Sequence, residues 1–253
     1  MRAPERPPEP EPLALLRAGE IEVKGRLPWS SNGTFLVELG RPSEGEAAAD
    51  GAGRGDGHGA LRAVYKPARG ERALWDYPTG LFRRERAVYV VSEALGWGLV
   101  PETVVRDGPL GPGSVQRFVA ADFNEHYFTL LERPEHHATL RAICLFDLLV
   151  NNGDRKSGHC LLGTDGRVWA IDHGLCLHDE PKLRTVIWDF AGEAFPAERV
   201  DDVSRLALAP PDELAELLSG DEVDALVARA AALVRRPFFP GPSSHWAFPW
   251  PLV

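Results

Sequence analysis

Few cysteines, a single methionine and no long apolar run characterise this sequence, and each absence removes a class of protein. The cysteines among the 253 residues are Cys144, Cys160 and Cys176, an odd number at wide spacing. That pattern argues against a disulfide framework and a paired-cysteine zinc site, and it predicts buried thiols in a reducing compartment. No apolar run approaches the ~18 residues that cross a bilayer, so no integral membrane association is expected.

Positive charge is also scarce. Lys and Arg number 28 against 37 Asp and Glu, which gives a net charge of −9. A nucleic-acid or anionic-membrane surface needs clustered Lys and Arg, so no nucleic-acid partner is predicted. The N-terminal residues do not read as a signal peptide, which favours a cytoplasmic location. The bias towards Ala, Arg, Gly and Pro suggests a bacterial protein.

The composition that remains, 44% hydrophobic and 26% charged, is that of a globular protein with room for two modest lobes. Pro/Glu-rich residues 1–12 predict a disordered leader, and Gly/Ala/Glu-rich residues 41–60 predict a flexible insertion. Residues 13–118 are predicted to form a first lobe. Its helix is expected at 81–95, closed by Gly96, and its strands at 21–27, 34–39, 61–67, 103–106 and 114–119, the last two around a turn at 107–113.

Residues 119–253 are predicted to form a second, mainly helical lobe. Helical spacing predicts helices at 138–150, 198–208, 212–218 and 221–236. Residues 238–253 are rich in proline and aromatic side chains and predict a tail packed on the surface, with partner binding as the alternative. A small antiparallel sheet with one helix, followed by a helical half, is an α+β fold of two lobes.

The most informative stretch runs from Leu145 to Gly174. An apolar run enters a polar loop that holds Asp154, and a tight hairpin then leads into a second apolar run that ends on Asp172. Two acids at the ends of buried elements are typical of metal-dependent phosphotransfer. One carboxylate accepts the proton of an attacking hydroxyl, and the other holds a divalent cation against a triphosphate. Two ordinary β-turns capped by Asp are the alternative.

These residues resemble the protein-kinase-like fold of the phosphatidylinositol 3-/4-kinase and HipA-type branch, and most closely an actinobacterial family described as phosphatidylinositol-kinase-like. The catalytic loop of the lipid-kinase branch reads Asp-Arg-His-x-x-Asn, and its metal-binding triplet reads Asp-Phe-Gly. The corresponding residues here are Asp154-Arg-Lys-Ser-Gly-His159 and Asp172-His-Gly174. The resemblance implies a two-lobed fold, with a small antiparallel sheet plus helix in one lobe and a mainly helical second lobe.

The resemblance also implies nucleotide-binding residues in the first lobe. Lys66 would contact the α- and β-phosphates, and Glu85 would orient that lysine through an ion pair. The hairpin loop at residues 28–34, between the first two predicted strands, would cover the phosphates through Ser30, Ser31, Asn32 and Gly33. The segment that joins the lobes would lie near the adenine, with Gln116 and Phe118 as the implied residues. The alternatives are an ordinary hairpin loop, a solvated lysine and a surface glutamate.

For catalysis, the resemblance makes Asp154 the proton acceptor and Asp172 a metal ligand. Lys156 would neutralise charge on the transferring phosphoryl group. His159 stands where the family has Asn, at the position of a second metal ligand, and imidazole suits Mn²⁺ better than Mg²⁺. The implied cofactors are therefore ATP and Mg²⁺ or Mn²⁺. A loop histidine bonded to a neighbouring carboxylate is the alternative for His159.

The favoured function is ATP- and metal-dependent phosphotransfer to a hydroxyl group of a protein or small molecule. A pseudokinase, which binds nucleotide or acts as a scaffold without phosphoryl transfer, is the first alternative. His159 and the lack of a Gly-rich loop support it. Nucleotidyl transfer is a second alternative. The sequence has no polybasic run that would bind a membrane surface. This disfavours a lipid substrate, although the family is described as phosphatidylinositol-kinase-like.

Overall fold

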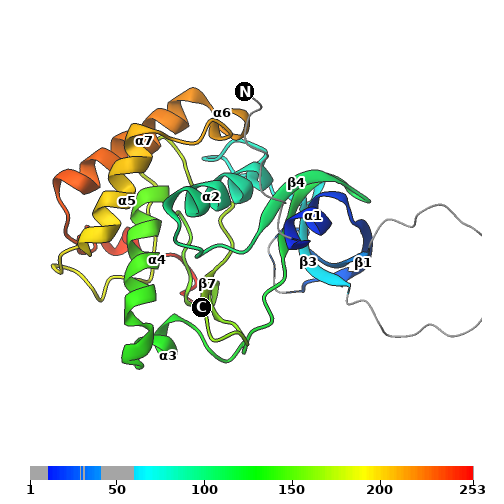
Figure 1. The fold of residues 1–253 in the computed structure, drawn as a ribbon, viewed down its shortest axis with the longest axis horizontal. Helices are drawn as coiled ribbons and strands as arrows, with labels where there is room; N and C mark the ends of the chain where they lie inside the picture. The colour runs from blue at the N-terminus through cyan, green and yellow to red at the C-terminus, as the bar shows by residue number, and fades with distance from the viewer. Residues whose placement is uncertain (1–10, 29, 31, 41–59, 253) are drawn as a thin grey trace, which may run out of the picture. The chain divides into compact units, whose positions relative to one another are not determined.

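The computed structural model describes residues 11–28, 30, 32–40 and 60–252. Contacts divide the chain into two compact units (Figure 1). The sheet unit comprises residues 1–72 and 102–118, and the helical unit comprises residues 73–101 and 119–253. The predicted first lobe included residues 73–101, which the contacts group with the helical unit. Most of the predicted leader and insertion, and Ser31 of the hairpin loop, lie outside the described residues.

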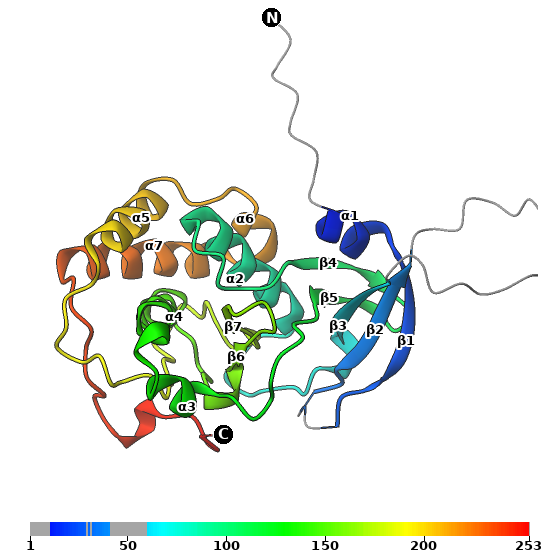
Figure 2. The same ribbon diagram turned by 60° about the horizontal axis from the view of Figure 1, so that its bottom comes forward.

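The sheet unit is a five-stranded antiparallel sheet with one helix packed on it (Figure 2). Strands follow the order β1-β2-β3-β5-β4. Their bounds are β1 Glu20–Arg26, β2 Phe35–Gly40, β3 Leu61–Pro67, β4 Thr103–Gly108 and β5 Gly111–Arg117, and the helix is α1 Glu11–Ala18. Inward-facing residues at alternating strand positions and Leu16 of α1 make the core. The strand residues are Val37, Leu39, Ala63, Tyr65, Val104 and Val115. The predicted sheet is confirmed.

One turn is tighter than predicted. The sequence favoured a seven-residue turn at 107–113, but β4 and β5 pair as far as Gly108 and Gly111. Gly111 takes a φ of 97°, which glycine adopts without steric cost. A Cβ at Gly113 would lie 2.5 Å from the Lys66 carbonyl oxygen, so glycine there allows β3 and β5 to approach. The glycines therefore extend this hairpin rather than break it.

The helical unit contains six α-helices and a short hairpin in its described residues. Helices α5 and α7 lie side by side in both views (Figure 1, Figure 2). The elements are α2 Leu81–Leu95, α3 Tyr127–Leu131, α4 His137–Val150, β6 Cys160–Leu162, β7 Val168–Ala170, α5 Ala197–Leu208, α6 Leu214–Leu217 and α7 Gly220–Arg235, with 3₁₀ turns η3 Ser157–His159 and η4 His245–Ala247. Helix α3 was not predicted.

Helix ends and cysteines follow the expected chemistry. Gly96 closes α2 in the left-handed conformation, and Ser219 caps α7 by accepting the Glu222 N–H. All three cysteines are buried and unbonded to one another, and burial raises the pKa of the Cys160 thiol to about 12. Within the described residues, no helix is both long and apolar enough to cross a bilayer.

Candidate active site

The loop that carries Asp154 begins where α4 ends. Asn151 closes the helix with a φ of 53°, a conformation that Asn tolerates better than most residues. Its side-chain amide donates to the carbonyls of His178 and Glu180, at 3.0 and 2.7 Å, and its oxygen accepts the Lys182 N–H at 2.9 Å. Asn151 therefore fastens the start of the loop to the segment that follows Asp172.

Asn152 shapes the next turn. Its side-chain oxygen accepts the backbone N–H of Asp154 at 3.0 Å, and its amide donates to Asp147 Oδ1 at 2.9 Å. Asp147 lies on α4 and has no exposed surface. The Asx turn thus leaves the Asp154 carboxylate outside the turn and connects the loop to the buried helix.

Arg155 is the centre of the site's scaffold and is fully buried. Its Nε and Nη2 donate to the Asp147 carboxylate at 2.9–3.1 Å. Nη1 donates to the carbonyls of Ile171, at 2.9 Å, and His159, at 3.3 Å. Nη2 also lies 2.8 Å from His173 Nε2, which must accept because a guanidinium has no acceptor. One side chain therefore joins the loops of Asp154, His159 and Asp172.

Asp154 has an environment suited to a general base. Burial, with a further contribution from the charge of Asp172, raises the pKa of Asp154 to about 6, although Lys156 acts in the opposite direction. Lys156 Nζ lies 3.5 Å from Asp154 Oδ2, and the two side chains are 23% and 31% exposed. A carboxyl group that titrates near neutral pH and is reachable by solvent can accept a proton from an attacking hydroxyl.

Asp172 and His159 face one another. His159 Nε2 lies 3.4 Å from Asp172 Oδ2, and the imidazole is 15% exposed where the carboxylate is 50% exposed. His159 Nδ1 accepts the Lys156 backbone N–H at 3.3 Å, so in the neutral ring Nε2 carries the proton. Asp172 has a φ of 61°, a left-handed conformation that is uncommon outside glycine.

Glu85 supports Asp172 from α2. Its buried carboxylate accepts the backbone N–H of His173, the residue after Asp172, at 3.1 Å. The neighbouring arginines anchor α2 within the helical unit. Arg84 pairs with Glu222 of α7, and Arg86 forms a two-pronged pair with Glu213 at 2.7 and 2.9 Å. Helix α2 is therefore held on both sides of Glu85.

The described residues contain no cluster of three or more His, Cys, Asp or Glu that could hold a metal by themselves. Asp172 and His159 supply one carboxylate and one imidazole. Such a pair fits a cation that completes its coordination with nucleotide phosphates and water, as Mg²⁺ and Mn²⁺ do. Coordination through His159 Nε2 requires the tautomer with the proton on Nδ1, which releases the Lys156 N–H. An imidazole nitrogen in the donor set would then suit Mn²⁺ better than Mg²⁺.

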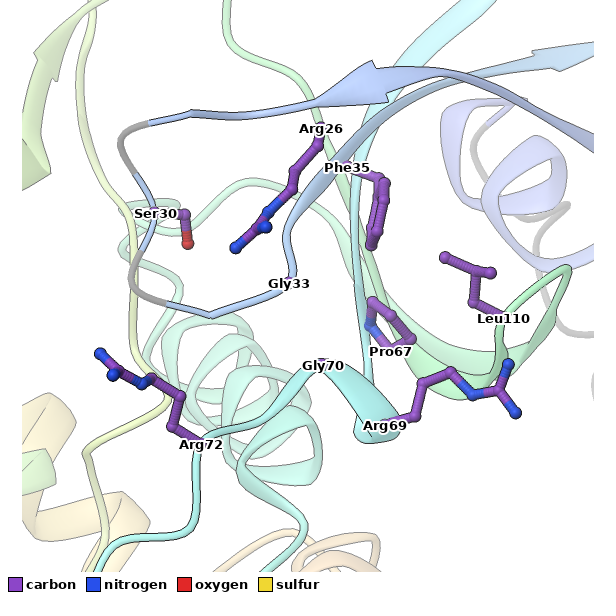
Figure 3. Close-up of a pocket in the computed structure, with 9 residues that line it drawn as sticks. All are labelled: Arg26, Ser30, Gly33, Phe35, Pro67, Arg69, Gly70, Arg72 and Leu110. Atoms are coloured by element: carbon purple, nitrogen blue, oxygen red, sulfur yellow. The ribbon is translucent and has the colours of Figure 1, made fainter.

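In the sheet unit, the hairpin loop borders a pocket of about 730 Å³ (Figure 3). Arg26, Ser30, Gly33 and Arg72 line one side of it, and none of the lining residues that the structure describes carries a carboxylate. Gly33 donates its N–H to the Gly70 carbonyl at 2.8 Å, and a Cβ on Gly33 would meet Gly70 Cα at 2.9 Å. The pocket is therefore a cationic hollow beneath a closely packed glycine contact.

The remaining predicted residues of the sheet unit lie on its strands or loops. Asn32 accepts the Arg72 N–H through its side-chain oxygen at 3.0 Å. Lys66 is on β3 opposite Ser114. Gln116 is buried and donates to the Thr103 hydroxyl at 2.8 Å, so its amide forms a hydrogen bond between β5 and β4. Phe118 donates its N–H to the Arg62 carbonyl at 2.9 Å, and the Arg62 guanidinium covers its ring.

Several site residues escaped the sequence analysis. Arg155 and His173 were not assigned roles, although an Asp inside the apolar helix, Asp147, signalled a buried counter-charge. Arg26 and Arg72 of the hairpin pocket gave no signal, because isolated arginines near strand ends are common.

Comparison with known proteins defines the class first. Residues 101–220 match the phosphatidylinositol 3- and 4-kinase family, so the chain contains a kinase-like domain. Among solved structures, the Golgi casein kinase with Mn/ADP bound superposes with a TM-score of 0.52 at 13% identity, covering 95% of this chain and 79% of that one. Hydra Fam20 with sugar gives 0.53 at 12% identity, covering 88% and 87%. These similarities confirm the predicted fold.

A relative in sequence narrows the assignment. Protein Rv2133c of Mycobacterium tuberculosis is 41% identical, and the match covers 94% of each chain. The chain belongs to the family of this mycobacterial protein, and the predicted resemblance to a bacterial phosphatidylinositol-kinase-like family is confirmed.

Proposed function

We propose that the protein is an ATP- and divalent-metal-dependent phosphotransferase with a hydroxyl group as acceptor. The observation that carries the proposal is the cluster around Arg155, the residue after Asp154. Its one buried side chain bonds Asp147, the Ile171 carbonyl before Asp172 and the His173 ring after it. Such a cluster supports the proposal because a base and a metal ligand on loops fixed in this way would not need to reorganise during the reaction.

Each residue has a distinct role in this proposal. Asp154 accepts the proton of the acceptor hydroxyl as that oxygen attacks the γ-phosphate. Lys156, 3.5 Å from Asp154, neutralises charge on the transferring group. Asp172 and His159 hold the cation, which when bound shields the charge of the phosphates. Glu85 keeps the backbone at His173 in place.

The sheet unit would supply nucleotide-binding groups. Ser30, Gly33 and the arginines of the pocket offer a hydroxyl and positive charge to phosphate oxygens (Figure 3). Lys66 as a phosphate ligand, its pairing with Glu85, and adenine binding near Gln116 and Phe118 remain predictions. The proposed acceptor is a protein or small molecule, because the net charge of −9 disfavours an anionic lipid surface.

Thermal unfolding with ATP alone and with Mg²⁺ or Mn²⁺ tests the proposal. A ligand at 100 times its Kd should stabilise the fold by about 2.7 kcal/mol. Asp172→Ala should abolish the metal-dependent part. Asp179→Ala is a matched control, because Asp179 is 47% exposed and lies 2.8 Å from His178, much as Asp172 lies beside His159. Absence of any stabilisation by ATP with either metal would overturn the proposal.

The second candidate is a pseudokinase, and His159 is the observation that favours it. An imidazole facing the metal carboxylate at 3.4 Å weakens Mg²⁺ coordination relative to an amide oxygen. Label followed from γ-labelled ATP separates the candidates. Transfer that requires Asp154 and Asp172 supports the phosphotransferase, binding without transfer supports the pseudokinase, and transfer from α-labelled ATP supports nucleotidyl transfer.

A further inference from the structure

The C-terminal residues 245–252, here called the strap, run along the loop that carries Lys156 and His159. The Ser157 backbone N–H donates to the Leu252 carbonyl at 2.9 Å. Nearer the start of the strap, the Thr185 N–H donates to the Ala247 carbonyl at 3.0 Å. The Phe248 ring packs edge-on against Trp188, with 6.3 Å between the ring centroids. The strap therefore contacts both the Asp154 loop and the segment that follows Asp172.

Each anchoring point on the protein is itself part of the site's scaffold. Ser157 is fully buried and begins η3, the turn that ends on His159. Thr185 is 1% exposed and donates its hydroxyl to Asp147 at 3.3 Å. The backbone of Arg155 bonds to Arg184 and Val186 on either side of Thr185, at 2.9 and 3.1 Å. The strap is thus the outermost layer of a stack that continues to Arg155.

The side-chain pattern of the strap fits close backbone approach. Ala247 and Pro249 point inward and are buried, whereas Trp246 and Trp250 are 71% and 87% exposed. Burial of large aromatic side chains would yield more hydrophobic free energy than burial of alanine and proline. Small inward residues instead bring the strap's carbonyls within hydrogen-bonding distance of Ser157 and Thr185.

We infer that the strap is a positioning element for the catalytic loop, acting through Ser157 on the turn that presents His159. The inference rests on the proposed function insofar as His159 is a metal ligand there. Without the Leu252 carbonyl, the Ser157 N–H would lose its hydrogen-bond acceptor, and the loop would no longer be covered by the strap. The turn η3 would then sample other conformations. The expected consequence is weaker binding of metal–nucleotide with unchanged binding of nucleotide alone.

The test compares the full chain with a chain that ends at Trp250. This shortening removes the Leu252 carbonyl and keeps the contacts of Ala247 and Phe248, so the rest of the strap stays anchored. Full-length Trp250→Ala is the matched control, because this side chain is 87% exposed and the variant keeps the Leu252 carbonyl. Hydrogen exchange of the peptide that contains Ser157 should be at least about tenfold faster in the shortened chain only, while the Thr185 peptide stays protected.

Metal-dependent nucleotide binding supplies the second measurement. Titration with Mn²⁺ and ATP should give at least about fivefold weaker affinity for the shortened chain, with affinity for metal-free ATP unchanged. Equal protection of Ser157 in both chains would overturn the inference, as would faster exchange with unchanged Mn²⁺–ATP affinity. If the full chain binds no metal–nucleotide, the proposed function fails, and the exchange comparison alone still decides whether the strap fixes the loop.

Discussion

Removal of the Asp147 carboxylate is expected to destabilise the helical unit far more than removal of an exposed carboxylate. Asp147 and Arg155 have 0% exposure and are joined by contacts of 2.9–3.1 Å. Asp147→Ala leaves a guanidinium buried without its counter-charge and removes an acceptor used by Asn152 and Thr185. Breaking a buried pair from one side costs about 3–5 kcal/mol. For a domain of this size, the loss corresponds to a fall in Tm of roughly 6–20 °C.

Glu193→Ala is the matched control. Glu193 also forms a two-pronged pair, with Arg141 at 2.6 and 3.1 Å, but the two side chains are 43% and 28% exposed. Solvent screens such a pair, so its loss should cost less than about 1 kcal/mol. Urea unfolding followed by circular dichroism gives both values. The double variant Asp147→Leu/Arg155→Met removes the uncompensated charge and should recover part of the loss. Recovery stays partial because the carbonyls of Ile171 and His159 lose their donor. A loss for Asp147→Ala no larger than that for Glu193→Ala refutes the reasoning.

Three further predictions concern Asp154, His159 and the ion pairs that anchor α2. The folded-state pKa of Asp154 is raised from 3.8 to about 6, so its ionised form costs stability above pH 6 and nothing below the unfolded value. Asp154→Asn should therefore stabilise the fold by about 1–2 kcal/mol at pH 7.5, after allowance for screening, and urea titrations should show the gain vanish as the pH falls from 6 to 4. His159→Asn should shift nucleotide binding from a Mn²⁺ to a Mg²⁺ preference in calorimetric titrations; an unchanged preference would remove His159 from the metal site. Glu222→Gln leaves Arg84 buried without a counter-charge and should cost about 2–3 kcal/mol in urea unfolding, more than Glu213→Gln, because Glu213 is 41% exposed.

Much of the fold was predictable because its elements have strong periodicity. The apolar helix α4, the alternating strands and the glycine that ends α2 lie close to their expected positions. Helix α3 was missed because its five residues are too few to show a helical pattern. Helix α2 contacts α5 and α6, and Arg84 and Arg86 form ion pairs with residues far along the chain; no local pattern reports such partners.

The candidate site was predictable from its acids and not from its scaffold. Asp154 and Asp172 follow apolar runs, so their location at the ends of buried elements is visible in the sequence. Arginine side chains are mostly exposed in folded proteins, so the sequence predicts a surface location for Arg155, whereas its side chain is fully buried. The strap escaped for a related reason: its inward residues are small and its outward residues are tryptophans, the reverse of the pattern that predicts burial.

The geometry bears on the two interpretations that the sequence left open for the acids, a catalytic pair or two turn caps. An Asp that caps a turn accepts a nearby backbone N–H, as Asp165 does from Arg167 at 3.0 Å. At the Asp154 loop this capping is performed by Asn152, which leaves the Asp154 carboxylate beside Lys156. Asp172 has a left-handed φ of 61°, and a strained backbone persists only where its surroundings fix it. Glu85 holds the N–H that follows Asp172, and Arg155 holds the carbonyl that precedes it. A half-exposed carboxylate on a backbone fixed from both sides favours a ligand over a turn cap.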